Sequence, residues 1–552
     1  MGRHQGRCRV CRSEVDGRLL RFAEDLDLDV LTCLHRANPT LEGRDPACPR
    51  CVEAAVSLVA AELGIEALHD RIQASWPIDP GTTYGVLPVP MRLHANPFYR
   101  GRGVTIAFLD SGFFPHPDLV LRRNRVRLYV DASTTGIREL PEVEGSGVLS
   151  WHGLMTSTVA AGDGACSGGR YRGLASEASL VLVKISDPQG GVHDVDIERG
   201  LTWVKRNHRR LGIQVVNLSV GGDEEQSFRD SPVDQLVSEL VQAGVCVVAA
   251  AGNAGQRRLV PPASAPAAIT VGGLDDQNLM DSSAYRIWHS NYGETVDGIE
   301  KPELVAPSIW VAAPILPETD QIPQAEALDR LANAPPAEIH GIFRRLGEVA
   351  GLHSGWSRRR PTLIRAAARR LQVREQFLEG AYKRVEGTSF AAPIVSSTAA
   401  VMLEAHPGLT PLRLKEILLR TAEKVPGVDV VRQGHGVVDP REAVARALRE
   451  SRGPLDGLPL SPARDGRRVT FLFHAPGARP VAVVGGFNDW DPNAIPFREL
   501  RADVFAASVD IDLDRTWRYQ YLLDDGTVID DPENPRKEPD GAGGFVSKLM
   551  AT

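Results

Sequence analysis

Short apolar runs recur along the middle of the chain, and helical patterns separate them. The runs are VTIAFLD (104–110), LVLVKI (180–185), VVNLSV (215–220), VCVVAAAG (245–252) and AITVGG (268–273). They are short and rich in β-branched residues, and glycines follow most of them, which is typical of buried strands in a parallel sheet. The pattern therefore predicts an α/β domain, which we place at residues 84–450.

Three other segments have different patterns. Residues 1–80 combine a cysteine cluster with an apolar helical stretch, and residues 466–552 alternate polar and apolar positions between turn-like clusters. The alternation predicts a small all-β sandwich. The segment from about 315 to 384 lacks strand signals, and its second half is helical in pattern and rich in arginine. We therefore expect three domains, with an arginine-rich helical insertion in the second.

The length and the net charge of the chain limit the kinds of molecule that it is expected to bind. The chain has 552 residues, which is too many for one ordinary core, and a net charge of −7. This charge favours neither nucleic acid nor an anionic membrane as a partner. No apolar run reaches the roughly 18 residues of a membrane span, and the N-terminal residues lack the apolar core of a signal peptide. We expect a cytoplasmic protein that binds neither nucleic acid nor membrane.

Four polar residues stand at the ends of predicted elements. Asp110 closes the strand VTIAFLD, His152 begins the helical run WHGLMTSTVAAG, Asn253 follows the strand in CVVAAAGNAG, and Ser389 opens the helix in VEGTSFAAPIVSS. Hydrolysis of a peptide bond needs a nucleophile, a base, a group that orients the base and donors for an oxyanion. Each motif alone is weak, since a single Asp after a strand is more often a turn or cap residue. Together they supply one candidate for each role.

With these motifs the chain resembles the subtilisin-like peptidases, or subtilases. DSG with HPDL downstream, HG before a helix of small residues, and GTSFAAP are similar to the three signatures of that family, and VVNLSVGG is similar to its substrate-binding strand. The order Asp, His, Ser is also that of subtilisin. The resemblance covers most of 100–448 outside the insertion. It implies a parallel sheet with helices on both faces.

The resemblance also implies a serine endopeptidase that acts through an acyl-enzyme. Asp110, His152 and Ser389 would form its triad, and the side chain of Asn253 would form the oxyanion hole with the Ser389 N–H. A polypeptide substrate would add to the backbone of the strand end as an extra strand. The expected substrate-binding residues are Leu218, Ser219, Val220, Gly221 and Gly252.

Two residues depart from the family pattern. Leu154 stands where the family usually has threonine, two positions after the histidine. Val260 takes a place where the family often has glycine at the specificity pocket, so we expect a shallower pocket. No acidic residue is expected in that pocket, and a preference for basic residues is therefore not predicted.

The cysteines indicate a metal site at one end of the chain. Five of the seven lie in the first 51 residues, which does not suggest a disulfide framework. Two Cys-x-x-Cys pairs can bind one tetrahedral ion, which predicts a structural zinc with the ligands Cys8, Cys11, Cys48 and Cys51. Cys33 and His35 are alternatives for one ligand, and the competing interpretation is unpaired structural or redox cysteines. Calcium sites are common in the subtilases, but the sequence does not identify their ligands.

The C-terminal segment resembles the carbohydrate-binding module of isoamylase-type enzymes and of the β subunit of AMP-activated kinase. VTFLFHAPGARPVAVVGGFNDWDP and WRYQYLLDDGTVIDDPENP carry this resemblance. Trp490 matches one of two sugar-stacking tryptophans, whereas the other falls at Val528, a sugar-contacting lysine at Gln520 and an asparagine at Ser547. Most of the binding constellation is absent. We therefore expect packing or protein recruitment rather than glucan binding.

Three functions follow from the sequence. The leading one is cytoplasmic endoproteolysis of polypeptides. The alternatives are a binding or scaffold protein derived from a protease, and a processing factor targeted to glucans. The arginine-rich insertion is either a solvated helical face, or a lid or docking surface for an acidic partner or substrate.

Overall fold

The computed structural model describes most of the chain after residue 85. The described residues are 86–96, 99–141, 147–187, 189–280, 282–451, 458–459, 461–474, 479–534, 536–539 and 545–550, and, before these, 5–12, 14–16, 21–22, 34, 38, 41, 45–48 and 51–52. The chain divides into two compact units, Pro80–Ala443 and Met1–Asp79 with Val444–Thr552. Cys33 and His35 lie outside the described residues. No helix in the described ranges is both long enough and apolar enough to cross a membrane.

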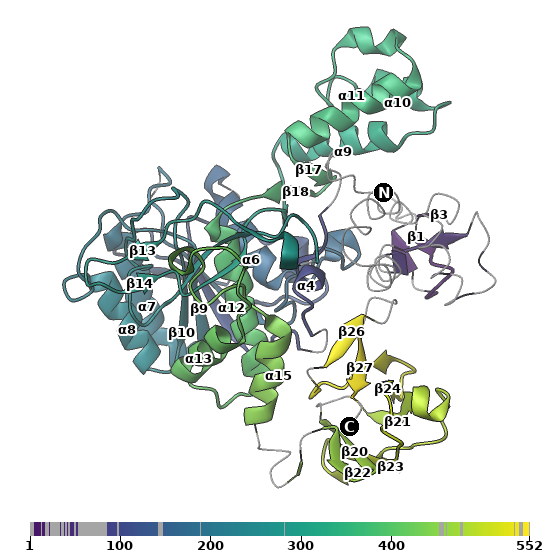
Figure 1. Cartoon of the computed structure of the whole chain (residues 1–552). Coiled ribbons are helices and arrows are strands. Elements are labelled where there is room, and N and C mark those ends of the chain that lie inside the picture. The colour runs from purple at the N-terminus through teal and green to yellow at the C-terminus, as the bar shows by residue number, and fades with distance from the viewer. Residues whose placement is uncertain are drawn as a thin grey trace. The chain divides into compact units, whose positions relative to one another are not determined.

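A mainly parallel sheet forms the centre of the first unit (Figure 1). Its strand order is β12-β11-β10-β9-β5-β8-β6-β7, with β15 beside β11, and the antiparallel strands are β7 and β12. The bounds are β5 (Thr105–Asp110), β6 (Val126–Asp131), β7 (Arg138–Leu140), β8 (Ser179–Lys184), β9 (Ile213–Leu218), β10 (Cys246–Ala250), β11 (Ile269–Asp275), β12 (Arg286–Ile287) and β15 (Leu304–Pro307). The predicted α/β class is confirmed.

The buried strands of the sheet are those that the sequence predicts. β5 and β10 are buried at every position, as expected for runs of Val, Ile, Leu and Ala between two layers of helices. β6 was not predicted, because its apolar run is short and interrupted by charged residues, as VRLYVD shows. The strand pairs with β8 on one side and with the short edge strand β7 on the other, and of its charged residues Arg127 is exposed and Asp131 is partly buried.

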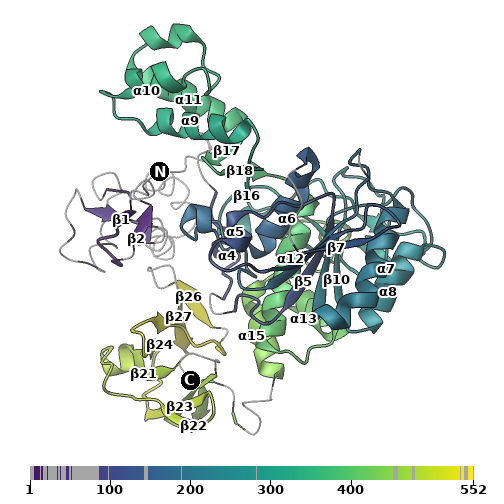
Figure 2. The ribbon, with the colours of Figure 1, turned by 180° about the vertical axis from the view of Figure 1, so that it is seen from behind.

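Helices cover both faces of the sheet (Figures 1 and 2). α7 and α8 pack against each other and against β9 and β10, and they bury an apolar core that includes Leu201, Val204 and Val237. On the other face α12 packs against α6 and against β9, β10 and β11. The bounds are α6 (Trp151–Ala161), α7 (Asp194–Leu211), α8 (Pro232–Gln242) and α12 (Thr388–Ala405). α12 is buried along nearly its whole length, because its small residues allow close packing on all sides.

The order of the strands places the candidate site. β5 lies between β8 and β9, although the chain visits β6 before it reaches β8. The carboxyl ends of β5 and β9 therefore lie where the winding of the sheet changes direction. In open α/β sheets ligands bind at such points, beyond the carboxyl ends of the strands. Asp110 ends β5, and Leu218 ends β9.

The insertion is a helical subdomain on a neck of short strands. Its helices are α9 (Gln321–Asn333), α10 (Ile339–Leu346) and α11 (Pro361–Arg374), and the neck consists of β16 (Val311–Pro314), β17 (Phe377–Glu379) and β18 (Tyr382–Val385). The expectation of no strand is wrong for β17 and β18. β18 pairs antiparallel with β16, which lies before the insertion in the sequence. Tertiary pairing therefore stabilises strands that local sequence does not favour.

Smaller elements complete the first unit. They are α4 (Val89–Arg92), α5 (Pro117–Val120), α13 (Pro411–Thr421), α14 (Val430–Gln433), α15 (Pro440–Glu450), which continues beyond the unit, β13 (Gly293–Glu294) and β14 (Glu300–Lys301). α5 is relevant to the insertion, because it carries Asp118 directly after the loop that follows β5.

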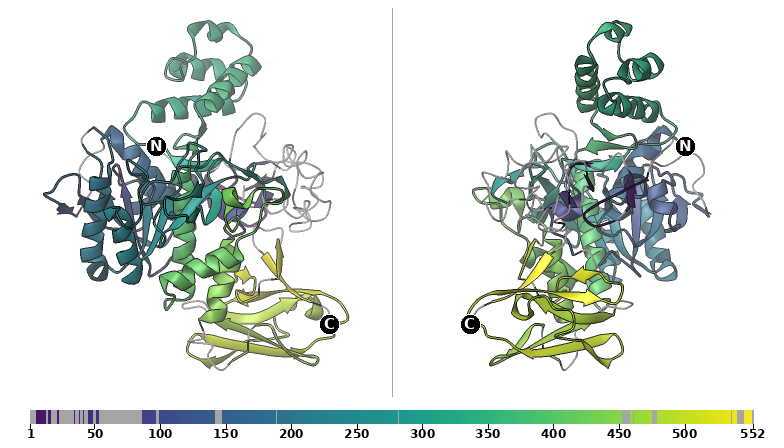
Figure 3. Two further views of the ribbon diagram at one scale, coloured as in Figure 1. Left: turned by 60° about the vertical axis from the view of Figure 1, so that its left-hand side comes forward. Right: turned by 90° about the vertical axis from the view of Figure 1, so that its right-hand side faces the viewer.

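The C-terminal domain is a β-sandwich, as its alternating pattern predicts. Figure 3 shows its two sheets stacked one above the other. Their orders are β19-β20-β23-β22 and β21-β24-β27-β26, with β25 beside β24. The bounds are β19 (Ala463–Asp465), β20 (Arg468–His474), β21 (Pro480–Gly485), β22 (Arg498–Arg501), β23 (Val504–Asp510), β24 (Trp517–Leu523), β25 (Val528–Ile529), β26 (Lys537–Pro539) and β27 (Phe545–Leu549). Aromatic side chains fill the space between them, among them Phe471, Phe473, Tyr519 and Tyr521.

The described part of the N-terminal region consists of two small antiparallel ladders. β1 (Gln5–Arg7) pairs with β2 (Glu14–Asp16), and β3 (Arg21–Phe22) pairs with β4 (Pro46–Ala47). One Cys-x-x-Cys pair directly follows β1, and the other directly follows β4. Two hydrogen bonds connect these segments, because the Arg9 N–H donates to the Pro46 carbonyl at 2.8 Å and the Cys48 N–H donates to Cys8 Sγ at 3.2 Å.

Candidate active site

Asp110 and His152 form a hydrogen bond at the carboxyl end of β5. His152 lies in the first turn of α6, and its Nδ1 is 2.7 Å from Asp110 Oδ1. The buried carboxylate also accepts hydrogen bonds from the Ser111 N–H at 2.7 Å and, on Oδ2, from the Thr156 hydroxyl at 3.0 Å. An ionised carboxylate can only accept, so Nδ1 carries the proton. This tautomer leaves His152 Nε2 as the acceptor.

The carboxylate also sets the charge state of the imidazole. Burial lowers the pKa of His152, but the charge of Asp110 and its hydrogen bond outweigh this effect and raise the pKa above the ordinary value of 6.5. The side chain of His152 remains 20% exposed, so protons and substrate can reach it. A histidine in this state can act as a base near neutral pH.

The glycine after the histidine permits the close approach of α6 to the end of β5. A Cβ atom at Gly153 would lie 2.1 Å from the Gly112 carbonyl oxygen and 2.9 Å from the Phe113 ring. Any larger residue would push the helix away from the strand end, and His152 would move with it. This contact is the physical reason for the HG pair in the sequence.

Ser389 lies in the first turn of α12 and faces the end of β9. Its hydroxyl donates to the Ser219 carbonyl at 3.5 Å, and the Ser219 hydroxyl donates to the Ser389 carbonyl at 2.9 Å. Within the described residues Ser389 has no hydrogen bond to His152, although the His152 ring centroid is 6.0 Å from that of Phe390, the next residue. The structure therefore brings the three predicted triad residues to one region and forms the Asp110–His152 bond.

Asn253 is oriented by the residue that precedes the serine. Its Oδ1 accepts from the Thr388 N–H at 2.9 Å and from the Thr388 hydroxyl at 2.7 Å. With the oxygen held in this way, the Nδ2 donors of this exposed side chain have no protein partner among the described residues. Gly252, which has a φ of 102°, donates its N–H to the Thr388 hydroxyl at 3.1 Å.

Other polar residues support this region, and the sequence did not indicate their roles. Asn291 Oδ1 accepts from the Ala254 N–H at 2.9 Å, and the Asn291 N–H donates to the Gly252 carbonyl at 2.9 Å. The buried Asn217 donates to the Ser219 hydroxyl at 2.9 Å. Asn291 lies outside the motifs that the sequence offers, whereas Asn217 lies within VVNLSVGG. Thr156 had a usable signal, since it follows His152 by four residues and so shares its helix face.

The predicted substrate-binding segment runs from the sheet to the surface. Leu218 and Ser219 are buried, Val220 is partly exposed, and Gly221 is exposed. A Cβ atom at Gly221 would lie 3.3 Å from Val260 Cγ2, so Val260 lies against this segment. Leu154, the other departure from the family pattern, is fully buried within α6.

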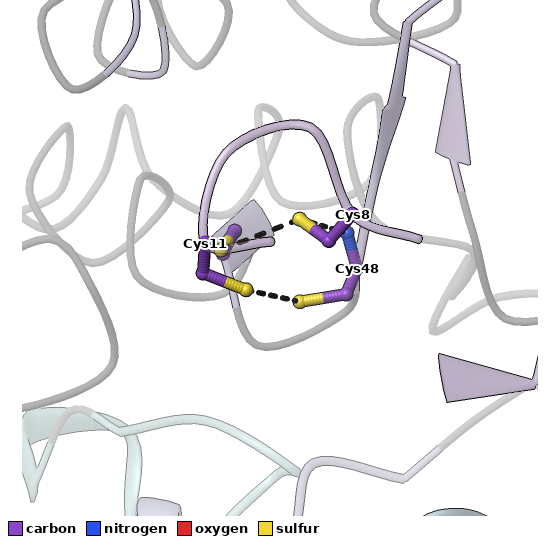
Figure 4. A group of neighbouring side chains, drawn as sticks. Cys8, Cys11 and Cys48 are labelled. Atoms are coloured by element: carbon purple, nitrogen blue, oxygen red, sulfur yellow. Dashed lines mark hydrogen bonds between the residues drawn. The ribbon is translucent and has the colours of Figure 1, made fainter. Parts of the chain in front are cut away.

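The four predicted zinc ligands lie together in the N-terminal region. The four Sγ atoms all lie within 4.8 Å of one another. Cys8 Sγ is 3.8 Å from Cys51 Sγ, and Cys11 Sγ is 3.7 Å from Cys48 Sγ. Figure 4 shows the thiols of Cys8, Cys11 and Cys48 pointing toward a common centre. Four converging sulfur atoms are the donor set of a structural zinc.

The thiols already interact with one another. The hydrogen bond with Cys11 raises the pKa of Cys8, but those with Cys48 and Cys51 lower it more, and the net result is a pKa of about 6. Hydrogen bonds with Cys11 and Cys8 raise the pKa of Cys48, although the one with Cys51 lowers it, and hydrogen bonds with the other three thiols raise the pKa of Cys51.

A second cluster of potential ligands consists of His116, Asp118 and Cys166. Both carboxylate oxygens of Asp118 have protein partners, because Oδ1 accepts from the Cys166 N–H at 2.9 Å and Oδ2 from the Tyr382 hydroxyl at 2.6 Å. Neither this group nor the cysteine cluster has the oxygen-rich donor set that calcium prefers. Asp118 instead holds two loops and the neck of the insertion together.

The C-terminal domain presents few of the expected sugar-binding groups. Trp490 is 43% exposed and Val528 is 45% exposed, so both of these positions face solvent. Ser547 is fully buried, and its hydroxyl accepts from the Asp531 N–H at 2.8 Å. Its side chain contributes to the fold rather than to a surface.

Comparisons with known proteins agree with both resemblances. The Subtilase family model matches residues 101–436, and the model of Carbohydrate-binding module 48 (Isoamylase N-terminal domain) matches residues 457–536. Serine protease AprX of Bacillus subtilis (strain 168) is 29% identical over 352 residues, which are 62% of this chain and 66% of the relative. Subtilisin Savinase of Lederbergia lenta is 30% identical over 229 residues, or 41% of this chain and 72% of the relative. Among solved structures, Sphericase aligns with a TM-score of 0.46 and 20% identity, covering 64% of this chain and 98% of that one. The match to the Bacillus protein spans just under two thirds of that protein's length.

Proposed function

The chain belongs to the subtilase family of serine proteases, and on this premise we propose that it is an endopeptidase whose triad is Asp110, His152 and Ser389. Its substrate would be a polypeptide that adds as an extended strand to residues 218–221. The single observation that carries the proposal is the 2.7 Å hydrogen bond between Asp110 and His152 at the carboxyl end of β5.

The reaction begins when the Ser389 hydroxyl turns from the Ser219 carbonyl toward His152 Nε2. The imidazole takes the proton as Ser389 Oγ attacks the substrate carbonyl carbon, and Asp110 stabilises the resulting imidazolium. The Asn253 Nδ2–H and the Ser389 N–H donate to the oxyanion, and the dipole of α12 also favours negative charge at this end. His152 then protonates the leaving amine, and water hydrolyses the acyl-enzyme by the same steps.

The test is labelling by a fluorophosphonate probe together with cleavage of a peptide library. We expect labelling and cleavage by the wild type, and neither by Ser389→Ala. Replacing any one of the three triad residues typically lowers kcat by about 10⁴–10⁶-fold. Equal labelling of both proteins, or no cleavage by a folded wild type, would instead support the alternative of a protease-derived binding or scaffold protein.

We further propose that the cysteine cluster binds a structural zinc. The support is the convergence of the sulfur atoms of Cys8, Cys11, Cys48 and Cys51 within 4.8 Å of one another, with no disulfide among these four residues. Four thiolates would leave no open coordination position, so the metal would stabilise the fold rather than take part in catalysis. Elemental analysis should give one zinc per chain, and Cys8→Ser with Cys51→Ser should abolish it. Retention of the metal by this double variant would contradict the assignment.

The two Cys-x-x-Cys pairs also support a cytoplasmic location. Thiols this close together would be prone to form disulfides in an oxidising compartment, whereas a reducing one keeps them available to a metal. Cell fractionation with thiol labelling before lysis tests this, because a protein in an oxidising compartment would be recovered away from the cytosolic fraction.

We propose three domains, with residues 1–80 and 466–552 flanking a peptidase domain at 84–450. Limited proteolysis tests these boundaries, since stable fragments should end near residues 80 and 460.

For the C-terminal domain we propose protein recruitment or packing rather than targeting to glucans, because only Trp490 of the expected sugar-stacking pair is present. Co-sedimentation with glycogen that Trp490→Ala abolishes would favour glucan targeting instead.

A further inference from the structure

Positive charge is concentrated in the second half of the insertion. Residues 339–374 contain nine arginines and one glutamate, in a chain whose net charge is −7. Six exposed arginines form no ion pair with any described acidic side chain: Arg344, Arg345, Arg358, Arg359, Arg360 and Arg370. Since most exposed basic residues in a mixed surface have acidic neighbours, this surface, which we call the arginine face, needs a separate explanation.

The arginine face is carried by a packed scaffold. α10 and α11 contact each other and α9, and a core that includes Leu331, Phe343 and Ile364 is buried between them. Arg344 and Arg345 lie in the last turn of α10, and Arg358–Arg360 lie directly before α11. Packing therefore fixes the backbone positions of these side chains, which reduces the entropy lost when they bind a ligand.

The neck connects this scaffold to the catalytic elements. β16 packs against α6, the helix that carries His152, and β18 ends only four residues before Ser389. The buried Tyr382 of β18 donates its hydroxyl to Asp118 at 2.6 Å, and its ring packs on Tyr171 at a centroid distance of 5.0 Å. These contacts fix the position of β18, from which the chain leads directly to Ser389.

We propose that the arginine face is an exosite that binds an acidic segment of the polypeptide substrate while another segment of the same chain occupies the cleft. The proposal rests on the proposed peptidase function and names its substrate class. Guanidinium groups suit this role, because their planar donors pair with carboxylates in a bidentate geometry. The continuous connection from the arginine face to the segment before Ser389 favours a ligand that is itself continuous with the substrate.

The experiment uses the full chain and a set of fluorogenic peptides with one shared cleavable core, chosen from the library. Each peptide carries six glutamates or six glutamines, placed on either side of the core after spacers of 4, 8 or 12 residues. An extended spacer covers roughly 3.3–3.6 Å per residue, so the best length measures the span between the two sites. We expect the acidic tail at its best spacer to raise kcat/KM about 10-fold, mainly through KM. At 1 M salt, where the screening length is about 3 Å, the gain should disappear.

Matched variants separate the arginine face from general charge. One triple variant carries Arg358→Gln, Arg359→Gln and Arg360→Gln. It should cleave the glutamine-tailed peptide like the wild type but lose most of the preference for the acidic tail. The control triple variant carries Arg206→Gln, Arg209→Gln and Arg286→Gln, which remove the same charge from exposed positions elsewhere in the unit. It should retain the preference for the acidic tail. The proposal requires both results.

The outcomes distinguish the two proposals. If no peptide is cleaved and Ser389 is not labelled, the proposed function fails. If peptides are cleaved but an acidic tail gives no advantage at any spacer, the function stands and the exosite is wrong. The exosite is also wrong if both triple variants lose the preference equally. Competition by single-stranded RNA in the absence of any tail effect would assign the arginine face to nucleic acid and likewise overturn the proposal.

Discussion

The peptidase core and the C-terminal domain use polar side chains in opposite ways. In the core, Asp110, His152 and Asn253 come from different elements and converge at the carboxyl ends of the strands, and His152 and Asn253 remain accessible. In the C-terminal domain the densest polar network is turned inward. There Asp531 Oδ2 accepts from the Tyr519 hydroxyl at 2.8 Å and from the Ser461 hydroxyl at 2.7 Å, and all three residues are buried.

This difference shows what distinguishes a reactive site from a structural network. Both networks contain buried, hydrogen-bonded carboxylates. In the core one partner of the carboxylate, His152, has a second nitrogen that the protein leaves available. In the C-terminal domain the partners of Asp531 Oδ2 are buried hydroxyls with further buried partners, because Ser461 bonds to the Tyr521 hydroxyl and Tyr519 accepts from the Asn534 amide. Burial of a carboxylate therefore indicates function only where the network ends at an accessible group.

The largest effect is expected when the charge of Asp110 is removed from the hydrogen-bond network of the peptidase core. Asp110→Asn should lower kcat about 10⁴-fold, because the amide no longer holds His152 in the reactive tautomer. In the wild type, kcat/KM should fall as the pH drops through a His152 pKa above 6.5, because the protonated imidazole cannot act as a base. Without the Asp110 charge only burial remains, so the acid limb of the residual activity should move to lower pH.

The sign for stability is opposite to that for activity. Since the folded-state pKa of His152 is raised, the ion pair stabilises the fold below about pH 6.5, and this contribution is lost as the pH rises through the folded pKa. A pH–rate profile of Asp110→Asn with an unchanged acid limb would show that Asp110 does not set the charge of His152.

The next test removes an accessible donor while keeping the buried acceptor. Asn253→Asp retains an oxygen for the Thr388 N–H and hydroxyl but replaces the amide N–H groups. We expect kcat to fall about 10²–10³-fold, or about 2.7–4 kcal/mol, with little change in KM. Asn253→Ala should lose as much activity and also loosen the loop, which a lower melting temperature would show. If Asn253→Asp retained full activity, Asn253 would not be an oxyanion donor.

A smaller effect is expected at the edge of the substrate-binding segment. Val260→Gly removes the side chain that lies against Gly221 and should deepen the pocket there. The preference for a large aromatic over a small residue on the acyl side of the cleaved bond should rise about 10-fold, in line with the discrimination available from one small apolar group. Cleavage-site profiling with the peptide library measures this change. An unchanged profile would place Val260 outside the pocket.

The smallest effect belongs to the C-terminal domain and concerns stability alone. Glu533 is buried, and burial together with the charge of Asp531 raises its pKa to about 8, against the opposing hydrogen bond from the Ser461 N–H. The folded state therefore holds this proton more tightly, and stability declines as the pH rises from about 4.5 to 8. In Glu533→Gln the free energy of unfolding should decline by about 1–3 kcal/mol less over this pH range.

Calorimetry of the full chain at pH 5 and pH 8.5 checks the prediction. The transition of the C-terminal domain should shift with pH in the wild type and much less in Glu533→Gln, while peptidase activity stays the same. A variant that loses activity would show that this buried network is coupled to the active site, and the contrast between the two regions would fail.

The sequence predicted the sheet and the sandwich because both are encoded by local patterns. β5 and β10 are continuous apolar runs, and β20 and β24 alternate, so each pattern matches the burial of its own strand. β18 was not predictable in this way, because its stability comes from pairing with β16 across an insertion of about 70 residues.

The candidate site divides in the same manner. Asp110, His152, Asn253 and Ser389 stand in recognisable motifs, and their grouping follows from the ends of the elements that carry them. The contacts that position them were not predictable. Thr388 bonds to Asn253 across 135 residues, and Tyr382 bonds to Asp118 across 264. Such contacts depend on tertiary structure that no local pattern reports.

The burial of α12 has a consequence for the way in which the protein would lose activity under stress. This helix is enclosed on nearly all sides, so its amide hydrogens should exchange with solvent only when the whole unit opens. Asn253 lies on an exposed loop whose hydrogen bonds can open locally. Gentle heating should therefore impair turnover first, while the serine is still held in place, and cooling should restore the enzyme without refolding of its core.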